Sequence, residues 1–217
     1  DDFDAGLKPG WIEHPKSSSG SSRWIIEGGK YRTRETGDNE SINGCEHLKN
    51  YEVLVNIQKS TDHAQGDYFG LILRSPPDLN NATSGYYMVR VVCFSCEGTN
   101  SSNHRYRLEL VDKQGPYDSV LTSVDLEPSE FSFLAGEDYT LKAIVTDDVL
   151  IGKFWKSSEL EPSDDPADTP KPADPPEPAR NGRTIETSNS SYSQGKIGLA
   201  SNTSKNTFDN LVVKPLS

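Results

Sequence analysis

The sequence predicts an all-β protein built from two antiparallel sheets packed as a sandwich. Apolar and polar residues alternate in many short runs, and these runs are separated by segments rich in Gly, Pro, Ser, Asn and Thr. Only 33% of the 217 residues are hydrophobic, and few runs have the spacing of a helix. Because the side chains of a strand point alternately to opposite faces, this alternation gives each strand one buried face. Short strands at close intervals are typical of a sandwich or a barrel.

Eight runs alternate clearly enough to be assigned as strands. In the run at 52–57, for example, Val53, Val55 and Ile57 share one face and polar residues occupy most of the other. The predicted strands are residues 52–57, 69–74, 86–92, 106–111, 139–145, 149–155, 196–200 and 208–213.

Two insertions interrupt the strands. Residues 75–85 form a long turn, and residues 157–187 are rich in Pro, Asp, Glu and Ser. Proline lacks a backbone N–H and fixes its backbone angle, so this density favours an exposed polyproline-like loop over helix or sheet. The strand at 208–213 lies beyond the loop and completes the same sandwich. We therefore expect residues 1–217 to form a single domain, a size that all-β sandwiches often reach.

Segments spread along the whole chain carry a resemblance to a known family. In order and spacing they resemble the concanavalin A-like lectin/glucanase jelly rolls, in the branch of carbohydrate-binding modules and laminarin- or keto-disaccharide-hydrolase-like domains. The resemblance implies a two-sheet jelly roll, a fold that serves lectins, hydrolases, lyases and spacer modules alike. The segments are Asp1–Asp4 with Trp11, Trp24–Gly29, Tyr68–Arg74, Gly85–Arg90, Trp155 with Glu161-Pro162, Gly195–Leu199 and Phe208–Val213.

The resemblance also implies a structural Ca²⁺ that joins the two ends of the chain. The matching positions are Asp2, the carbonyl of Gly29 and Asp209, with Asp4 or Asn210 able to assist. Calcium takes six to eight hard oxygen ligands, so carboxylates supplemented by carbonyls suit it. The alternative is that Asp2 and Asp209 are ordinary surface or turn-capping carboxylates.

The polar faces of the predicted strands form the candidate surface for a glycan. Arg and Glu side chains supply planar hydrogen-bonding groups, and Tyr supplies a platform for the C–H face of a sugar. The resemblance places Arg74 and Arg90 at positions that are commonly Arg in the module family. The alternative is cross-strand ion pairing on a solvated sheet. The predicted glycan-binding residues are Glu52, Arg74, Tyr86, Arg90, Arg107 and Glu109.

The sequence does not support catalysis, and we expect no catalytic residue. Glycoside hydrolysis usually requires two carboxylates across the scissile bond. The related laminarinases supply them from one strand as Glu-x-Asp-x-x-Glu, which this chain lacks, and it has no Gly-x-Ser-x-Gly elbow or phosphate loop. The predicted function is a carbohydrate-binding, lectin-like module. The alternatives are a glycoside hydrolase or polysaccharide lyase with a dispersed site, and a structural or adhesion module.

Charge and hydropathy exclude other partners. The net charge of −11 argues against nucleic acid and against anionic lipid, since both reward clustered Lys and Arg. No apolar stretch approaches the roughly 20 residues that span a bilayer. The expected partner is a polysaccharide or another glycan, and other domains of a larger polysaccharide-active or cell-surface protein are further candidates.

The cysteines and the glycosylation sequons bear on the cellular compartment. Cys93 and Cys96 have redox or metal spacing, but no second pair completes a zinc site. We expect a disulfide, either Cys93–Cys96 across a turn or Cys45 with one of the two. An extended strand would hold residues three apart about 10 Å from each other, too far for a bridge. Asn-x-Ser/Thr sequons favour an extracellular or cell-surface protein. They lie at Asn39, Asn81, Asn100, Asn189 and Asn202.

Overall fold

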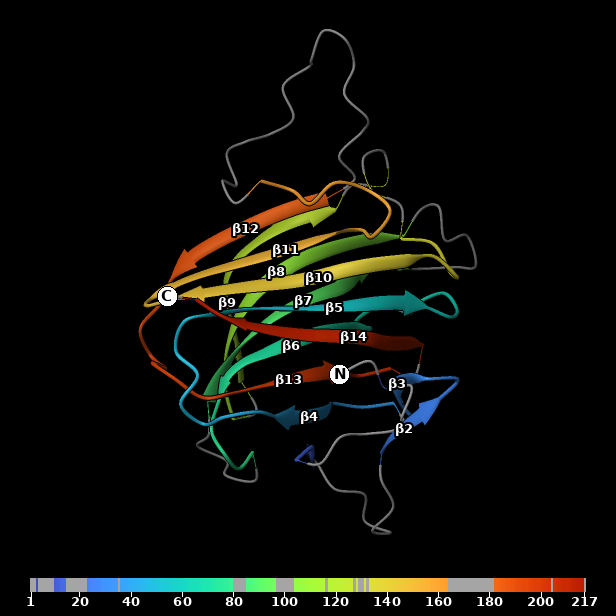
Figure 1. Ribbon diagram of the computed structural model, residues 1–217. Coiled ribbons are helices and arrows are strands. Elements are labelled where there is room, and N and C mark those ends of the chain that lie inside the picture. The colour runs from blue at the N-terminus through green and yellow to red at the C-terminus, as the bar shows by residue number, and fades with distance from the viewer. Residues whose placement is uncertain are drawn as a thin grey trace, which may run out of the picture.

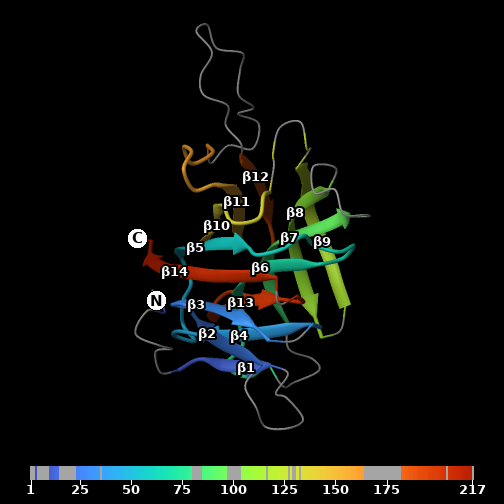
Figure 2. The same ribbon diagram turned by 90° about the vertical axis from the view of Figure 1, so that its right-hand side faces the viewer.

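The computed structural model is a sandwich of two seven-stranded antiparallel sheets, as the sequence predicts (Figure 1). Figure 2 shows the two layers after a turn of 90°. The structure describes residues 3, 10–14, 23–34, 36–79, 85–96, 104–115, 117–126, 128, 131, 133–163, 182–203 and 205–216.

Sheet A contains seven strands in an order that differs from the order of the chain. From edge to edge they are β1 (Ile12–His14), β4 (Asn39–Asn43), β13 (Lys196–Ser201), β6 (Tyr68–Ser75), β7 (Gly85–Ser95), β8 (Arg105–Gln114) and β9 (Tyr117–Leu126).

Sheet B is built in the same way and lies in front of sheet A in Figure 1. Its strands are β12 (Gly182–Ser188), β11 (Val149–Lys156), β10 (Asp138–Thr146), β5 (Tyr51–Lys59), β14 (Asn206–Pro215), β3 (Lys30–Thr33) and β2 (Trp24–Glu27).

All eight predicted strands are confirmed, because alternation in the sequence becomes alternation in burial. In β5, Tyr51, Val53, Val55 and Ile57 are fully buried, and the residues between them are partly exposed. β13 and β14 follow the proline-rich segment in the sequence, yet each lies inside a sheet, β13 between β4 and β6 and β14 between β5 and β3. The chain on both sides of that segment therefore belongs to the same sandwich.

Two parts of the structure differ from the sequence prediction. The predicted loop at 157–187 is wrong at its end, because residues 182–188 form β12 and pair with β11. Ile185, which follows the last proline by several residues, is buried in the core and anchors this edge strand. Residues 164–181 lie outside the described residues. The second difference is that the prediction did not include β1, β2, β3, β4 and β9. In β9 the apolar residues do not alternate regularly with the polar ones.

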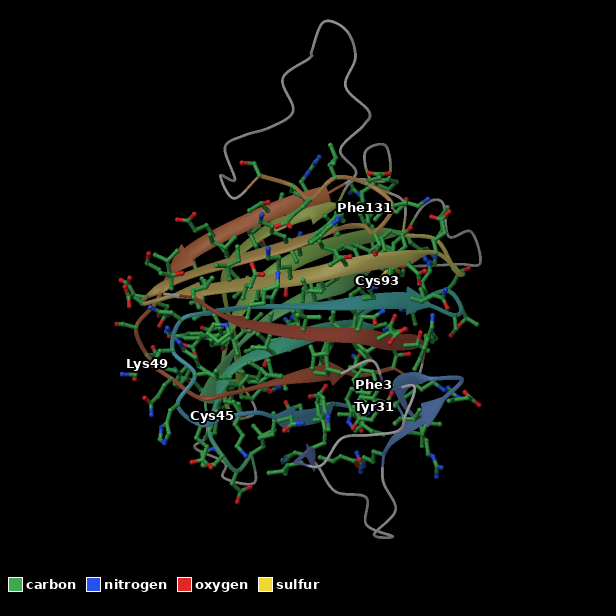
Figure 3. All side chains as sticks on the ribbon, viewed as in Figure 1. Phe3, Tyr31, Cys45, Lys49, Cys93 and Phe131 are labelled. Carbon is green, nitrogen blue, oxygen red and sulfur yellow. A yellow bond between two sulfur atoms is a disulfide. The ribbon has the colours of Figure 1, made fainter. Side chains whose placement is uncertain are left out.

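Aromatic residues fill both ends of the core between the sheets. At one end Phe133 lies 5.4 Å from Phe69 and 5.5 Å from Phe154, measured between ring centroids. At the other end, Phe3 stacks on Tyr31 at 5.1 Å and Trp24 on Tyr31 at 4.7 Å; Phe3 and Tyr31 are labelled in Figure 3. The second cluster joins the opening segments of the chain to each other.

Among the described residues, no helix has the length and hydrophobicity needed to cross a membrane.

Candidate functional site

The outer face of sheet A carries one row of residues that crosses five strands. Strand register aligns Glu40 of β4, Ala200 of β13, Gly70 of β6, Arg90 of β7 and Glu109 of β8. The two middle positions have minimal side chains, while the ends of the row carry charged groups. We call Ala200 and Gly70, the small residues in the middle of the row, its floor. The charged residues on either side of them are its polar walls.

Position 70 must be glycine, because neighbouring atoms leave no room there for a Cβ atom. A Cβ atom there would lie 2.6 Å from the carbonyl oxygen of Val89 and 3.0 Å from the Cβ of Arg90. Real Cβ atoms essentially never approach a backbone oxygen so closely, so any larger residue would push β6 away from β7.

Two tyrosines extend across this floor. The hydroxyl of Tyr86 on β7 donates to the carboxylate of Glu40 on β4, although β6 and β13 lie between these strands. Side chains of strands so far apart meet only where the sheet face curves inward, so the outer face of sheet A is concave here. The hydroxyl of Tyr68 donates to Asp38 at 3.0 Å.

Burial shifts the ionisation of these groups. It raises the pKa of Glu40, although the Tyr86 hydrogen bond opposes the shift. Burial, together with the charge of Glu40, raises the pKa of Tyr86 well above its ordinary value. Tyr86 therefore remains a neutral hydrogen-bond donor throughout the physiological pH range.

A charged network forms the opposite wall. Arg90 donates to Glu109 at 2.8 Å and to Asp118 of β9 at 2.6 Å, and Lys113 lies 3.2 Å from Asp118. The guanidinium of Arg90 also lies over the ring of Tyr68, 5.4 Å from its centroid. These contacts hold Arg90 in one orientation, so its planar edge is fixed before a ligand arrives.

An apolar patch adjoins the polar row on the same face. Leu79, from the connection between β6 and β7, packs on this patch and is 6% exposed. The outer face of sheet A is therefore amphipathic, with a covered apolar patch beside the polar row, and is not a uniformly solvated surface. The buried members of the patch are Ile42, Tyr68, Ile72, Leu79, Tyr86, Met88, Val111 and Ala200.

The structure brings together four of the six predicted glycan-binding residues. Tyr86, Arg90 and Glu109 lie on the concave face, and Arg107 lies on the same face, two positions before Glu109 along β8. Arg107 pairs with Asp125 at 2.6 Å and is partly exposed.

The expectation that Glu52 shares this surface with the other predicted residues is wrong. Glu52 belongs to β5, which lies in sheet B, so its side chain is on the opposite outer surface of the sandwich. There it pairs with Lys142 at 2.9 Å and Lys214 at 2.8 Å.

The expectation is also wrong for Arg74. This residue has a φ of 51°, which removes it from the alternation of its strand. Its guanidinium is directed to the end of the sandwich, where it donates to the carbonyls of Tyr192 at 2.8 Å and Lys49 at 3.0 Å, and also to that of Asp147. Arg74 thus ties three loops together.

Sequence reasoning missed several residues of the concave face. Glu40 lies in Asn39–Asn43, where Ile42 is the only apolar residue, so no alternation marks the strand. Asp118 lies on β9, a strand that the sequence analysis did not predict. The position of Tyr68 could have been predicted, because Tyr68, Gly70 and Ile72 alternate along the chain and therefore share one face of the strand.

The position predicted for calcium lies on the outer face of sheet B. Asp209 pairs in register with Asn56, and both line a shallow polar pocket. Asn210 has a φ of 51° and donates its backbone N–H to Asp209 at 2.8 Å. The other lining residues are Lys30, Gln58, Asp138 and Thr207.

The oxygen donors of this pocket fit a hard cation. Carboxylate, amide and hydroxyl oxygens are present, and the ammonium of Lys30 is engaged by Gln58 at 3.2 Å. Gly29, with a φ of 76°, is in the turn that leads into Lys30. Asp2 and Asp4 lie outside the described residues.

Of the three disulfide pairings left open by the sequence, the structure contains Cys93–Cys96, with a Cα–Cα distance of 5.9 Å. Cys45 is free and exposed.

The fold uses the side chains of three sequon asparagines. Asn39 is fully buried. The amide of Asn202 accepts from Tyr68 N–H at 2.6 Å and donates to the carbonyl of Gly66 at 2.9 Å. Asn189 accepts from the hydroxyl of Tyr87 at 2.7 Å. Asn81 and Asn100 lie outside the described residues.

Solved structures with the same architecture include carbohydrate-binding proteins. The carbohydrate-binding module CBM66 from Bacillus subtilis is 15% identical over 94% of this chain and 95% of its own, with a TM-score of 0.58. The exoplasmic/lumenal domain of VIP36, in its Ca²⁺- and Man3GlcNAc-bound form, is 11% identical over 96% of this chain and 85% of its own, with a TM-score of 0.61.

A xylan β-1,4-xylosidase from Bacillus halodurans C-125 is 15% identical over 99% of this chain, with a TM-score of 0.59, and the match covers 38% of that enzyme. No protein-family model matches the sequence, and no curated protein is significantly similar to it. The structural matches show the fold, which is that of the concanavalin A-like lectin/glucanase β-sandwich.

Proposed function

We propose that this protein is a carbohydrate-binding, lectin-like module and that its glycan site is the concave outer face of sheet A. The observation that carries the proposal is the row Glu40–Ala200–Gly70–Arg90–Glu109. It combines a low floor, two tyrosines and an arginine held in place by two carboxylates.

This combination suits the chemistry of a sugar ring. A sugar presents C–H groups on its faces and hydroxyl groups around its edge, so it needs both an apolar or aromatic platform and directed polar groups. Ile12 and Val92, the partly exposed apolar residues at the margin of the patch, supply the first, and the Arg90–Glu109–Asp118 network supplies the second. We expect weak binding, because an open face leaves part of the ligand in water and polar desolvation is costly.

The structural matches support a glycan as the ligand class. One of these structures is a carbohydrate-binding module, and another is bound to Man3GlcNAc. The match to part of a xylosidase supports a module that belongs to a larger polysaccharide-active or cell-surface protein. We also propose an extracellular or cell-surface location, where such ligands occur.

A structural Ca²⁺ completes the proposal. We assign Asp209, the Gly29 carbonyl and Asp2 as ligands, with Asn210 or Asp4 assisting, and the Ca²⁺-bound VIP36 domain supports the ion class. A ligand that binds only the native state stabilises it by about 2.7 kcal/mol at 100 times its Kd. We expect EDTA to lower the melting temperature and Asp209→Ala to abolish that difference. Identical melting curves with and without EDTA would remove the calcium site and leave the glycan site untouched.

A glycan array followed by calorimetry tests the binding site. The intact protein should bind at least one polysaccharide or oligosaccharide, and Arg90→Ala should weaken that binding by about 1.5–3 kcal/mol, the range for a hydrogen bond to a charged group. Arg32→Ala is the matched control, because Arg32 lies on the outer face of sheet B and pairs with Glu27. A blank array, or equal binding by the two variants, would contradict the proposal. Release of reducing sugar would instead indicate a hydrolase.

A further inference from the structure

Two sulfur atoms and one imidazole nitrogen meet at one end of the sandwich. The ligand atoms of Cys93, Cys96 and His104 all lie within 4.8 Å of one another. All three residues are buried, at 0%, 6% and 3% exposure. This is the only group of three or more His, Cys, Asp or Glu side chains with metal-site spacing in the described part of the chain.

The backbone explains why the three residues converge. The register of β7 against β8 shifts between Cys93 and Ser95, and this irregularity brings the two cysteines to the same side. β8 begins with Arg105 opposite Ser95, and Tyr106 lies opposite Cys93. His104 immediately precedes β8, so it lies next to Cys96 across the hairpin.

The loop at 60–67 holds the cysteine turn independently of the sulfur–sulfur bond. The backbone N–H of Cys96 donates to the side-chain oxygen of Gln65 at 3.1 Å, and the Gln65 amide donates to the carbonyl of Phe94. The N–H of Cys93 donates to the carbonyl of Asp67 at 2.8 Å. Reduction of the disulfide removes none of these contacts, so the two thiols remain side by side.

We propose that the reduced form of Cys93 and Cys96, together with His104, binds one borderline divalent cation of the Zn²⁺ class. Cysteine thiolates and imidazole are the usual protein ligands of zinc. Zinc is four-coordinate, so three protein ligands leave one position for water or an exogenous ligand. Two thiolates also neutralise the dication, which avoids a net charge in a buried site.

The disulfide and the metal are mutually exclusive. An external thiol reductant delivers two electrons to the sulfur–sulfur bond, which breaks, and two protons give two thiols. Metal binding then releases those two protons and forms two metal–sulfur bonds. When a small-molecule disulfide accepts two electrons and is itself reduced to two thiols, the Cys93–Cys96 bond re-forms and the ion is expelled. The site therefore loads only under reducing conditions, and an oxidising compartment keeps it closed.

Cobalt titration tests the proposal, with Co²⁺ alone as the probe. The protein carrying Cys45→Ser is reduced, freed of reductant without air and titrated while the thiolate-to-cobalt absorption is recorded. Cys45 is exposed and lies far from Cys93 in Figure 3, so its removal leaves only the two relevant thiols. We expect one Co²⁺ per chain, displaced by Zn²⁺, in the reduced protein and none in the oxidised protein.

Two further measurements keep the test decisive if a variant folds poorly. His104→Gln should weaken cobalt binding by at least about tenfold, the lower end of the losses caused by perturbing a metal site. Zn²⁺ should raise the melting temperature of the reduced Cys45→Ser protein and protect both thiols from alkylation. Reduced, folded protein without thiolate–cobalt absorption, or equal binding by Cys96→Ser, would overturn the proposal.

Discussion

The outer faces of the two sheets carry similar residue types but are organised differently. On sheet A, Arg90 and Glu109 join two tyrosines around a floor of Gly70 and Ala200. On sheet B, lysines and glutamates form a chain of ion pairs that runs from Lys214 through Glu52, Lys142 and Glu161 to Lys153. Charged residues that alternate along a strand therefore show only which side chains lie on the outer face of a sheet. A concave site also requires small residues in its middle and a sheet that curves inward.

The ion-pair chain on sheet B fixes the segment that follows β11. Lys153 is 2% exposed and donates to Glu161 at 2.7 Å and to the carbonyl of Pro162 at 2.8 Å. Thr184 of β12 donates to the carbonyl of Ser163 at 2.7 Å. These contacts bring the two sides of the proline-rich segment together at the edge of sheet B, so we assign this face a structural role.

The largest effect should come from breaking this chain. Glu161→Ala removes a carboxylate partner 2.7 Å from the buried ammonium of Lys153, and removing one partner of a buried ion pair costs roughly 3–5 kcal/mol. The side chain of Glu161 is 40% exposed, so screening by solvent reduces this cost, and we expect a loss of about 2–3 kcal/mol in the free energy of unfolding, measured by urea denaturation. Glycan binding should not change.

Glu27→Ala is the matched control for this variant. Glu27 pairs with Arg32, and its side chain is 64% exposed, so its removal should cost less than about 1 kcal/mol. Equal losses in the two variants would show that the chain from Glu52 to Lys153 is no more important than a surface pair.

A smaller effect concerns the pH dependence of stability, which we expect to have opposite signs for glutamates on the two faces. Burial raises the pKa of Glu40 on sheet A, whereas hydrogen bonds from Lys214 and Lys142 lower the pKa of Glu52 on sheet B. The stability contributed by Glu40 is greatest at low pH and is lost as the pH rises through its folded pKa. The contribution of Glu52 is present above its ordinary pKa and is lost as the pH falls through its folded pKa.

The corresponding glutamine variants should therefore diverge near neutral pH. We expect Glu40→Gln to melt at a higher temperature than the parent at pH 7, and Glu52→Gln at a lower temperature. The Glu40→Gln difference should shrink as the pH approaches 4, because the parent carboxyl of Glu40 gains its proton there, whereas the Glu52→Gln difference should persist to lower pH. Melting temperatures recorded between pH 4 and 8 check this, and shifts of the same sign would refute the contrast.

The sequence predicted most of the fold because its long strands alternate strictly. The alternation at Val53, Val55 and Ile57 correctly predicted the buried face of β5. The predicted strand at 208–213 is part of β14. β9 was missed because its core-facing residues Leu121, Val124 and Leu126 are not evenly spaced, and its register against β8 is irregular. β4 was missed because buried polar residues such as Asn39 and Ser41 replace apolar ones.

The candidate site was predictable only in part, since alternation gives the face of a strand but not the sheet it joins. Arg90 and Glu109 were placed together because their strands are neighbours in sequence and in space. Glu52 was misplaced because β5 pairs with β10 and β14, which lie far away in the sequence. Arg74 was misplaced because its left-handed backbone conformation has no signal in the residue type.

The central claim is that a glycan binds the concave outer face of sheet A. Its most direct test is an amide chemical-shift titration of the isotope-labelled protein with the best ligand from the glycan array. We predict that the shifts concentrate on β4, β13, β6, β7 and β8, with Gly70 and Ala200 among the most affected, while amides around Glu52 stay unchanged. Shifts confined to sheet B, or to the loops that Arg74 holds together, would contradict the account.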